Sequence, residues 1–136
     1  MSFELRDHTA DVAVAATGHD REAVFAAAAD GLAAAMCEAI PDEGERFAVE
    51  VTAESPEALL FDYLDELIYQ RDVRGVLPID NEVTITGEDD ALALSGSARG
   101  VPLDAVTARE VKAVTYSEMA LEATPEGWRA YVVFDV

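Results

Sequence analysis

Apolar residues in the first third of the chain follow two periods, one typical of strands and one typical of helices. Residues 11–16 alternate β-branched and small side chains without a polar helical face, which predicts a strand that ends at Gly18. After Asp20, a suitable N-cap, an apolar residue recurs at every fourth position. This pattern predicts a helix that ends near Ile40 and Pro41. Its apolar stripe is Val24, Ala28, Leu32 and Met36.

A second strand and a second helix follow. Residues 47–52 place Phe or Val at every other position, so one face of a strand would be buried and the other exposed to water. Ser55, Pro56 and Glu57 then supply a capping hydroxyl, a proline at the first helical position and a carboxylate at the positive helix end. We expect a helix over residues 56–71. Its apolar stripe is Leu60, Tyr63, Leu64, Leu67 and Ile68.

The rest of the chain predicts strands. Two of them flank a polar turn and two flank a turn that contains Pro125 and Gly127, so we expect two hairpins. The expected strands are 83–86, 91–94, 111–116, 119–123 and 128–134. Strand, helix, strand, helix and then a run of strands favours an α+β fold, with two helices packed on a mostly antiparallel sheet. We expect one domain over residues 1–136, since domains usually run to about 100–200 residues.

The charge balance changes the range of functions. Nine basic and 28 acidic residues give a net charge of −19, which would repel a phosphate backbone, so we expect no direct binding of nucleic acid. Lys112 is the only lysine, the other basic residues are arginines, and alanine is abundant. This composition indicates a salt-rich cytoplasm, where molar salt would shorten the Debye length to about 3 Å. An ordinary acidic protein is the alternative.

The sequence also bears on location. It has no basic leader followed by an apolar run, and no stretch approaches the roughly 20 apolar residues that a membrane span needs. Cys37 is the only cysteine and lies within an apolar helical pattern, so we expect it to fill the core. We therefore expect a cytoplasmic protein that does not bind membranes.

Carboxylates concentrate near the start of the chain. The segment 7–11 (Asp-His-Thr-Ala-Asp) places two carboxylates and an imidazole where the first predicted strand begins. Carboxylate oxygens are natural ligands of hard divalent cations. A turn in which Asp7 and Thr9 satisfy backbone donors, with His8 in a structural role, is the other interpretation, and spacing alone favours it.

The end of the chain adds two more anions. Asp135 precedes Val136, and period-two alternation places Asp135 on the opposite face from Phe134. If the first and last predicted strands are neighbours, Asp11, Asp135 and the carboxylate of Val136 would meet, and a divalent cation would relieve their repulsion. On that condition, which the sequence alone does not establish, we expect a metal site at these three residues. The sequence shows no zinc-ligand pattern, nucleophile motif or phosphate loop, so we expect no catalytic residues.

Four stretches in this order resemble the archease family. They are Asp7 to Asp11, the helical Tyr63 to Tyr69 (Tyr-Leu-Asp-Glu-Leu-Ile-Tyr), Glu110 to Tyr116 (Glu-Val-Lys-Ala-Val-Thr-Tyr) and the terminal Phe134 to Val136. Each stretch is short, but together they span nearly the whole chain. Three positions depart from the usual family pattern. Ser117 stands where a histidine commonly follows, Asp65 replaces an asparagine, and the segment 100–109 is short and lacks its customary histidine.

The resemblance implies a function. It implies an accessory protein of RtcB-type tRNA ligases that promotes GTP-dependent ligase guanylylation and multiple turnover in tRNA splicing, and that is not itself an enzyme. It also implies a divalent cation, calcium before magnesium or manganese, held at Asp11, Asp135 and Val136. Two other functions stay open: a metal-dependent phosphate-ester hydrolase that activates water at Asp11 and Asp135, and a general chaperone-like modulator of RNA-modifying proteins. The sequence leaves the oligomeric state open.

Overall fold

The structure of the chain is a computed structural model that describes residues 2–7 and 11–136, without the side chains of Arg6, Asp7 and Asp11. Two helices, one short 3-10 helix and seven strands lie in this part of the chain. They are β1 (Ser2–Asp7), β2 (Asp11–Gly18), α1 (Arg21–Met36), β3 (Glu45–Ala53), α2 (Pro56–Arg74), β4 (Val76–Glu88), β5 (Ala91–Pro102), η1 (Leu103–Ala105), β6 (Ala113–Thr124) and β7 (Gly127–Asp135).

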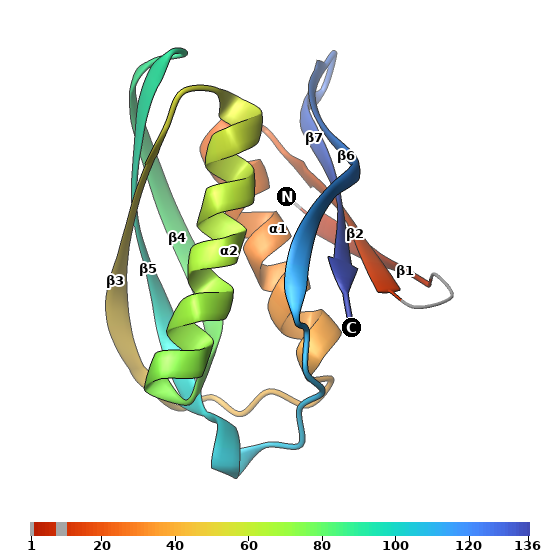
Figure 1. Ribbon diagram of the computed structural model, residues 1–136, viewed down its shortest axis with the longest axis vertical. Coiled ribbons are helices and arrows are strands. Elements are labelled where there is room, and N and C mark those ends of the chain that lie inside the picture. The colour runs from red at the N-terminus through yellow and green to blue at the C-terminus, as the bar shows by residue number, and fades with distance from the viewer. Residues whose placement is uncertain (1, 8–10) are drawn as a thin grey trace.

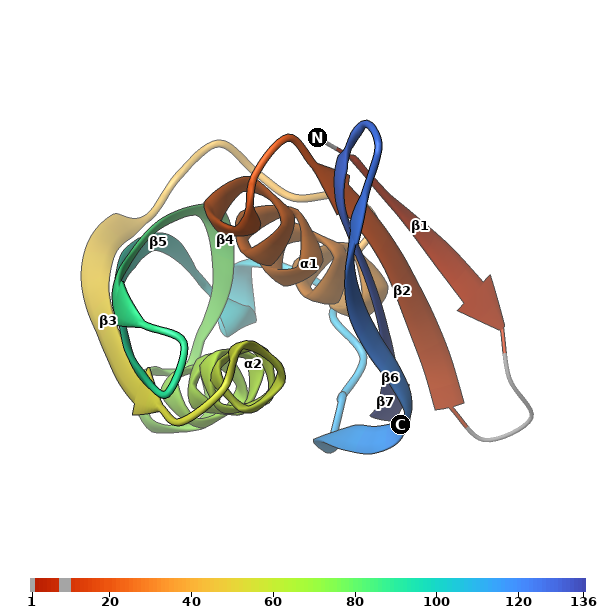
Figure 2. The ribbon, with the colours of Figure 1, turned by 90° about the horizontal axis from the view of Figure 1, so that it is seen from above.

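Two antiparallel sheets enclose the two helices. One sheet has the strand order β1-β2-β7-β6 and the other has the order β3-β5-β4. Figures 1 and 2 show both helices between the two sheets, and α1 contacts β2 and β4 while α2 contacts β3 and β6. This confirms the predicted α+β class. The single expected sheet is in fact two sheets, and the helices are therefore covered on two sides.

Small side chains let both sheets approach α1. Twelve of its 16 residues are buried, most of them alanines. A Cβ added at Gly31 would lie only 2.5 Å from Val14 Cγ1, which shows how closely the helix crosses β2. The Asp20 carboxylate accepts a hydrogen bond from Ala23 N at 2.7 Å, as expected of the N-cap. The helix ends at Met36, earlier than predicted, because Cys37 is extended and its buried thiol lies in the core.

The ends of α2 follow from its sequence. Ser55 Oγ accepts from Ala58 N at 3.1 Å, Pro56 occupies the first turn, and Gly75 ends the helix in the left-handed region at φ 66°. The helix runs three residues beyond its predicted end. Its buried stripe contains every predicted residue and adds Leu59 and Arg71.

The predicted hairpins are confirmed as β4–β5 and β6–β7, and both have longer strands than expected. The expected strands 111–116 and 119–123 form one strand, β6, which starts at Ala113. Its register with β7 shifts between Thr115 and Ala120, where Glu118 has φ 61°. Strand β1 was not predicted. It lies at the edge of its sheet with Phe3 and Leu5 exposed, so it lacks the burial that makes alternation informative.

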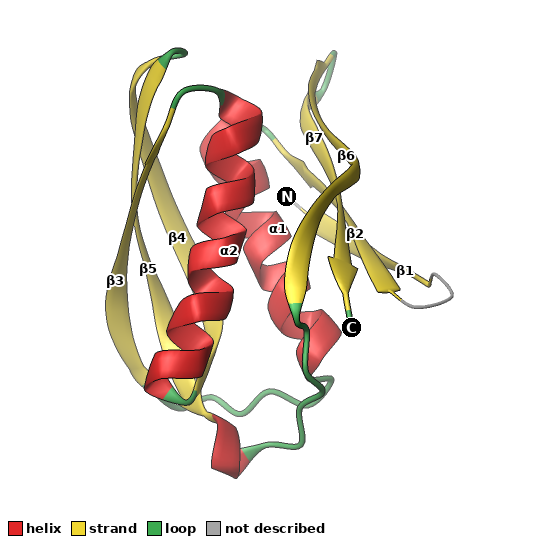
Figure 3. Cartoon of the chain, in the orientation of Figure 1, coloured by secondary structure: helices red, strands yellow, loops and turns green. Residues whose placement is uncertain are grey.

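One hydrophobic cluster fills the space between the sheets and includes residues of both helices and both sheets. At one end of the helices, the segment 106–112 passes the C-terminal end of α1 (Figure 3), where Arg109 N donates to Met36 O at 2.8 Å. In the described part of the chain, neither helix is long and apolar enough to span a membrane.

Candidate functional site

The first and last predicted strands are neighbours in one sheet. Strand β2 pairs antiparallel with β7, and the register places Asp11 directly opposite Asp135. On its other side Asp135 is opposite Ala113, the first residue of β6. The condition on which the metal prediction depended is therefore met at the level of the backbone.

The side chain of Asp135 points away from the core, as the alternation predicted. Val132 and Phe134 are fully buried, whereas Asp135 is exposed and makes no ion pair with any residue that the structure describes. Val136 is half-buried and its side chain packs against the core. The last residue of the sequence is thus held in place beside the exposed Asp135 carboxylate.

Part of the predicted site lies outside the described residues. This is true of His8, Thr9 and Ala10, and of the side chains of Asp7 and Asp11. The described side chains contain no group of three or more His, Cys, Asp or Glu residues placed to hold a metal ion. The ligand set of Asp11, Asp135 and Val136 therefore stays a prediction.

The donor chemistry of the predicted set fits a hard cation. Two aspartate carboxylates and a terminal carboxylate would offer only oxygen atoms, which calcium, magnesium and manganese prefer over softer metals. Asp11 and Asp135 come from neighbouring strands of a sheet that is packed on one face, so the backbone that carries them is well supported. Val136 would contribute its terminal carboxylate and not its apolar side chain.

The only lysine of the chain lies next to this end of β7. Lys112 N donates a hydrogen bond to Asp135 O at 2.8 Å. Its side chain is exposed and makes no ion pair with a described residue. A single ammonium group therefore extends from the backbone that borders the predicted anionic site.

Arg71 is a buried residue that sequence analysis missed. It is 6% exposed, and its Nη1 donates to Val111 O at 2.8 Å. Its Nε and Nη2 lie 3.0 and 2.9 Å from the same carboxylate oxygen of Asp72. Arg71 continues the helical stripe Leu60, Leu64, Leu67 by one further turn. An arginine on an otherwise apolar stripe was the available signal for a buried cation.

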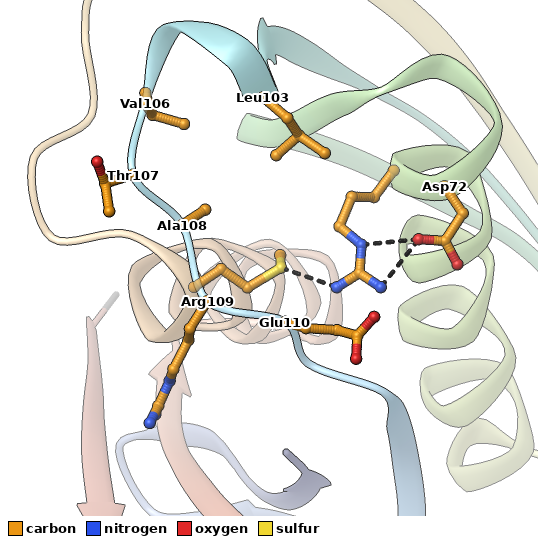
Figure 4. A pocket seen from close by; sticks show the side chains of 9 residues that line it. Asp72, Leu103, Val106, Thr107, Ala108, Arg109 and Glu110 are labelled. Carbon is orange, nitrogen blue, oxygen red and sulfur yellow. Dashed lines mark hydrogen bonds and ion pairs between the residues drawn. The ribbon is translucent and has the colours of Figure 1, made fainter.

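A hollow of about 420 Å³ adjoins Arg71 (Figure 4). It lies between the C-terminal ends of α1 and α2 and the segment 103–110, and dashed lines in Figure 4 mark the contacts to Asp72. Apolar side chains line much of it, and Asp72 and Glu110 are exposed carboxylates on its wall. The lining residues are Met36, Arg71, Asp72, Leu103, Val106, Thr107, Ala108, Arg109 and Glu110.

A second arginine caps α1 from outside the helix. Arg109 Nε donates to Ala35 O at 2.9 Å, and Arg109 N donates to Met36 O at 2.8 Å. The last carbonyl groups of a helix have no partner within the helix, and α1 has no basic residue in its last turn. Arg109 supplies hydrogen-bond donors for these carbonyl groups and a positive charge at this end of the helix. It thereby attaches the segment before β6 to the end of α1.

A polar cluster inside the fold was also missed. Asp30 Oδ1 accepts hydrogen bonds from Asn81 N at 3.1 Å and Asn81 Nδ2 at 2.9 Å, and burial raises the pKa of Asp30. The cluster satisfies the backbone where the β4–β5 register shifts, next to Asp80 at φ 48°. Burial, followed by the charge of Asp30, raises the pKa of Tyr63, whose hydroxyl is 3.5 Å from Asn81 Oδ1. A lone aspartate within the alanine-rich helix was the sequence signal.

Two positions that depart from the family pattern are on the surface. Asp65 lies on the exposed side of α2, and Ser117 lies at the irregularity in β6. Neither belongs to the core. These departures therefore change the exposed surface and leave the packing intact.

Known proteins of similar sequence cover almost the whole chain. The model of the family described as "Archease protein family (MTH1598/TM1083)" matches residues 3–136. "Protein archease" of Methanothermobacter thermautotrophicus is 36% identical over 137 residues, which cover 98% of each chain. "Protein archease" of Pyrococcus furiosus is 34% identical over 139 residues, with the same coverage.

Solved structures also resemble the chain. A solution structure of Methanobacterium thermoautotrophicum protein 1598 matches with a TM-score of 0.86 and 35% identity, over 99% of both chains. A crystal structure of "an archease, possible chaperone" from Thermotoga maritima matches with a TM-score of 0.64 over 96% of this chain and 94% of the other. At 22% identity, the second likeness supports the fold alone.

Proposed function

The chain belongs to the archease family, and from this premise we propose that it activates an RtcB-type RNA ligase in tRNA splicing. It would promote GTP-dependent guanylylation of the ligase and multiple turnover, without being an enzyme itself. We further propose a cytoplasmic location and a salt-rich one, on the grounds of composition and charge.

The observation that carries the proposal is the meeting of distant segments at one end of a sheet. Asp11 is opposite Asp135, and the amide of Lys112 bonds to the carbonyl of Asp135. These residues belong to three of the stretches that resemble the family. They lie at an end of the sheet that is exposed to solvent. A site in that position can contact a partner protein directly.

We propose that a divalent cation binds here, most suitably calcium, with magnesium or manganese as alternatives. Residues directly opposite each other on antiparallel strands have Cβ atoms about 4.5–5.5 Å apart. The carboxylates of Asp11 and Asp135, with that of Val136, are proposed to share the cation, which would offset their repulsion. A cation bound there would supply positive charge at the end of the sheet that is proposed to contact the ligase. Lys112 would add a second positive group beside it.

The overall charge supports a protein partner more than an RNA partner. At −19 the chain would not compete for the phosphate backbone of the spliced RNA. It would be attracted to the basic surface of an RNA-binding enzyme, which raises the rate of encounter. We therefore propose that the ligase is the direct partner and that this chain needs no contact with RNA.

The proposal is tested with the purified cognate ligase in high salt. Guanylylated ligase and ligated product per ligase are measured with wild type, Asp135→Asn and Glu126→Gln. Glu126 is an exposed carboxylate in the turn at the other end of the β6–β7 hairpin, so it controls for loss of one charge. Wild type and Glu126→Gln should stimulate both steps, and Asp135→Asn should stimulate them much less. No stimulation by wild type would refute the proposal.

The same protein preparations separate the competing functions. Without ligase, the chain should hydrolyse neither GTP nor phosphate esters. Metal-dependent turnover that disappears in Asp11→Ala would instead support a hydrolase. Isolation of the tagged chain from cells should recover the ligase, whereas recovery of several RNA-modifying enzymes in similar amounts would support a general modulator.

A further inference from the structure

One peptide group next to the candidate site is held at both of its polar atoms. The carbonyl oxygen of Val111 accepts a hydrogen bond from Arg71 Nη1 at 2.8 Å. The N–H of the same peptide group, which belongs to Lys112, donates to Asp135 O at 2.8 Å. The peptide between Val111 and Lys112 thus bridges helix α2 and strand β7, and we name this arrangement the peptide bridge.

The preceding segment leaves Lys112 dependent on this bridge. Residues 106–112 form no helix or strand, and the hollow of about 420 Å³ lies behind residues 103–110. Arg109 attaches the segment to α1, and the fully buried side chain of Val111 anchors the segment in the core. Neither contact fixes the rotation of the next peptide plane. That rotation sets the direction in which Lys112 leaves the backbone.

Arg71 is suited to this role by its burial and its partners. Burying a guanidinium is unfavourable unless its donors are paired. Asp72 neutralises one edge, Val111 O accepts from Nη1, and Met36 Sδ lies 3.3 Å from Nη1. Its planar donors fix the direction of each bond, which a flexible ammonium group would not do. An apolar residue would complete the stripe of α2 at lower cost, so packing alone does not explain an arginine here.

We propose that Arg71 is a positioning residue that orients Lys112 beside the end of β7 through the peptide bridge. The proposal rests on the proposed function for its consequence, since the oriented lysine would act on the ligase. It does not depend on the identity of the bound cation. Arg71 itself would not contact the ligase, and it would act only through its hydrogen bond to the Val111 carbonyl.

The bridge is tested first without ligase, by hydrogen exchange of backbone amides in wild type, Arg71→Met, Arg71→Lys and Arg74→Met. Methionine fills a similar volume without a donor. Arg74 lies three residues further along α2, is exposed, and bonds to Gln70 at 2.7 Å, so its substitution removes the same charge. Arg71→Met should speed exchange of the Lys112 amide about tenfold or more relative to core amides such as that of Val132. Arg74→Met should not, and Arg71→Lys should be intermediate.

Ligase stimulation then tests whether the orientation of Lys112 matters for activation. Lys112→Met and the double variant Arg71→Met with Lys112→Met are added to the series. If Arg71 acts through Lys112, the double variant should stimulate guanylylation no less than Lys112→Met alone. Arg74→Met should stimulate like wild type. Unchanged exchange at Lys112 in Arg71→Met would overturn the inference, as would additive losses in the double variant. If wild type fails to stimulate the ligase, the proposed function fails, and the exchange result alone decides whether the bridge exists.

Discussion

Asp11 and Asp135 stand directly opposite each other where β2 begins and β7 ends. Opposite residues of an antiparallel pair have Cα atoms about 4.5–5.5 Å apart, so segments from the two ends of the sequence share one small region. Val136 follows Asp135 directly, and Lys112 bonds to the carbonyl of Asp135 from the other side. Three proposed anions and one cation therefore depend on the same strand end.

The proposed cation site should depend on each of its carboxylates. We predict that Asp11→Asn, Asp135→Asn and a two-residue C-terminal extension each weaken divalent-ion binding about tenfold or more, because ligand charge strongly tunes affinity for hard cations. Isothermal titration calorimetry with calcium, magnesium and manganese measures the loss. Ligase stimulation should fall in parallel, while the circular-dichroism spectrum stays that of wild type.

The extension is the most specific of these variants, since it leaves every side chain in place and moves only the terminal charge. Glu126→Gln is the matched control and should bind the cation as wild type does. If the extended chain binds metal and activates normally, the carboxylate of Val136 is not a ligand. The roles of Asp11 and Asp135 would then be those of strand-end residues that satisfy local backbone groups.

Local signals in the sequence predicted the elements better than their arrangement. The caps at Asp20 and Ser55 and the stripe of α2 indicated both helices, because caps and helical periodicity depend only on neighbouring residues. Strand β1 was missed because its apolar residues Phe3 and Leu5 are exposed at a sheet edge. The division into two sheets depends on long-range pairing, which local patterns do not encode.

The candidate site was predicted in part for the same reason. Alternation in the sequence placed Asp135 on the outer face. Its position opposite Asp11 depends on the pairing of β2 with β7, which the sequence pattern does not reveal. Arg71 and Arg109 were missed because their partners are backbone carbonyls of distant segments, Val111 and Ala35. Carbonyl groups are present at every position, so no residue type in the sequence marks them as partners.

Salt should stabilise this fold. We predict that the melting temperature rises as potassium chloride increases from dilute buffer to about 1 M, because ions screen the repulsion of a −19 surface. A gain of about 1 kcal/mol would raise the melting temperature of a chain this size by roughly 3–5 °C. Differential scanning calorimetry over a series of salt concentrations provides the measurement.

A charge variant separates screening from general salt effects. Glu43→Gln combined with Glu88→Gln removes two exposed carboxylates, one in the connection before β3 and one at the end of β4, and neither belongs to the candidate site. This variant should melt higher than wild type in dilute buffer and gain less from salt. A melting temperature that does not change with salt in wild type would contradict the proposed salt-rich environment and would leave the proposed function untouched.

The half-buried Asp30 should give stability a distinct pH dependence. Its folded-state pKa is raised above the ordinary value of 3.8 by burial, so the folded protein favours the protonated carboxyl. Its contribution is therefore most favourable below pH 3.8 and is lost as pH rises through the raised pKa. Asp30→Asn keeps an oxygen that can accept from Asn81 and removes the charge.

We therefore predict that Asp30→Asn gains stability relative to wild type as pH rises through the raised pKa of Asp30. Urea unfolding from about pH 3 to about pH 7 measures the difference for both proteins. Asp65→Asn, at an exposed position on α2, serves as the control and should show no such gain. A constant difference between Asp30→Asn and wild type would show that the hydrogen bonds, and not the charge, decide the role of Asp30.

Lys112 should matter to activation and hardly at all to stability. Its side chain is exposed and forms no ion pair with a described residue, so Lys112→Arg should change the free energy of unfolding by less than about 0.5 kcal/mol. A guanidinium is planar and broad where an ammonium is a compact point charge, so the two groups do not fit one contact equally. We predict that Lys112→Arg lowers the rate of stimulated ligase guanylylation several-fold, and that Lys112→Met lowers it further.

Stopped-time guanylylation assays measure the rate, and unfolding in urea measures stability. Wild-type kinetics in Lys112→Arg would show that any cation suffices beside Asp135, and wild-type kinetics in Lys112→Met would remove the lysine from the mechanism.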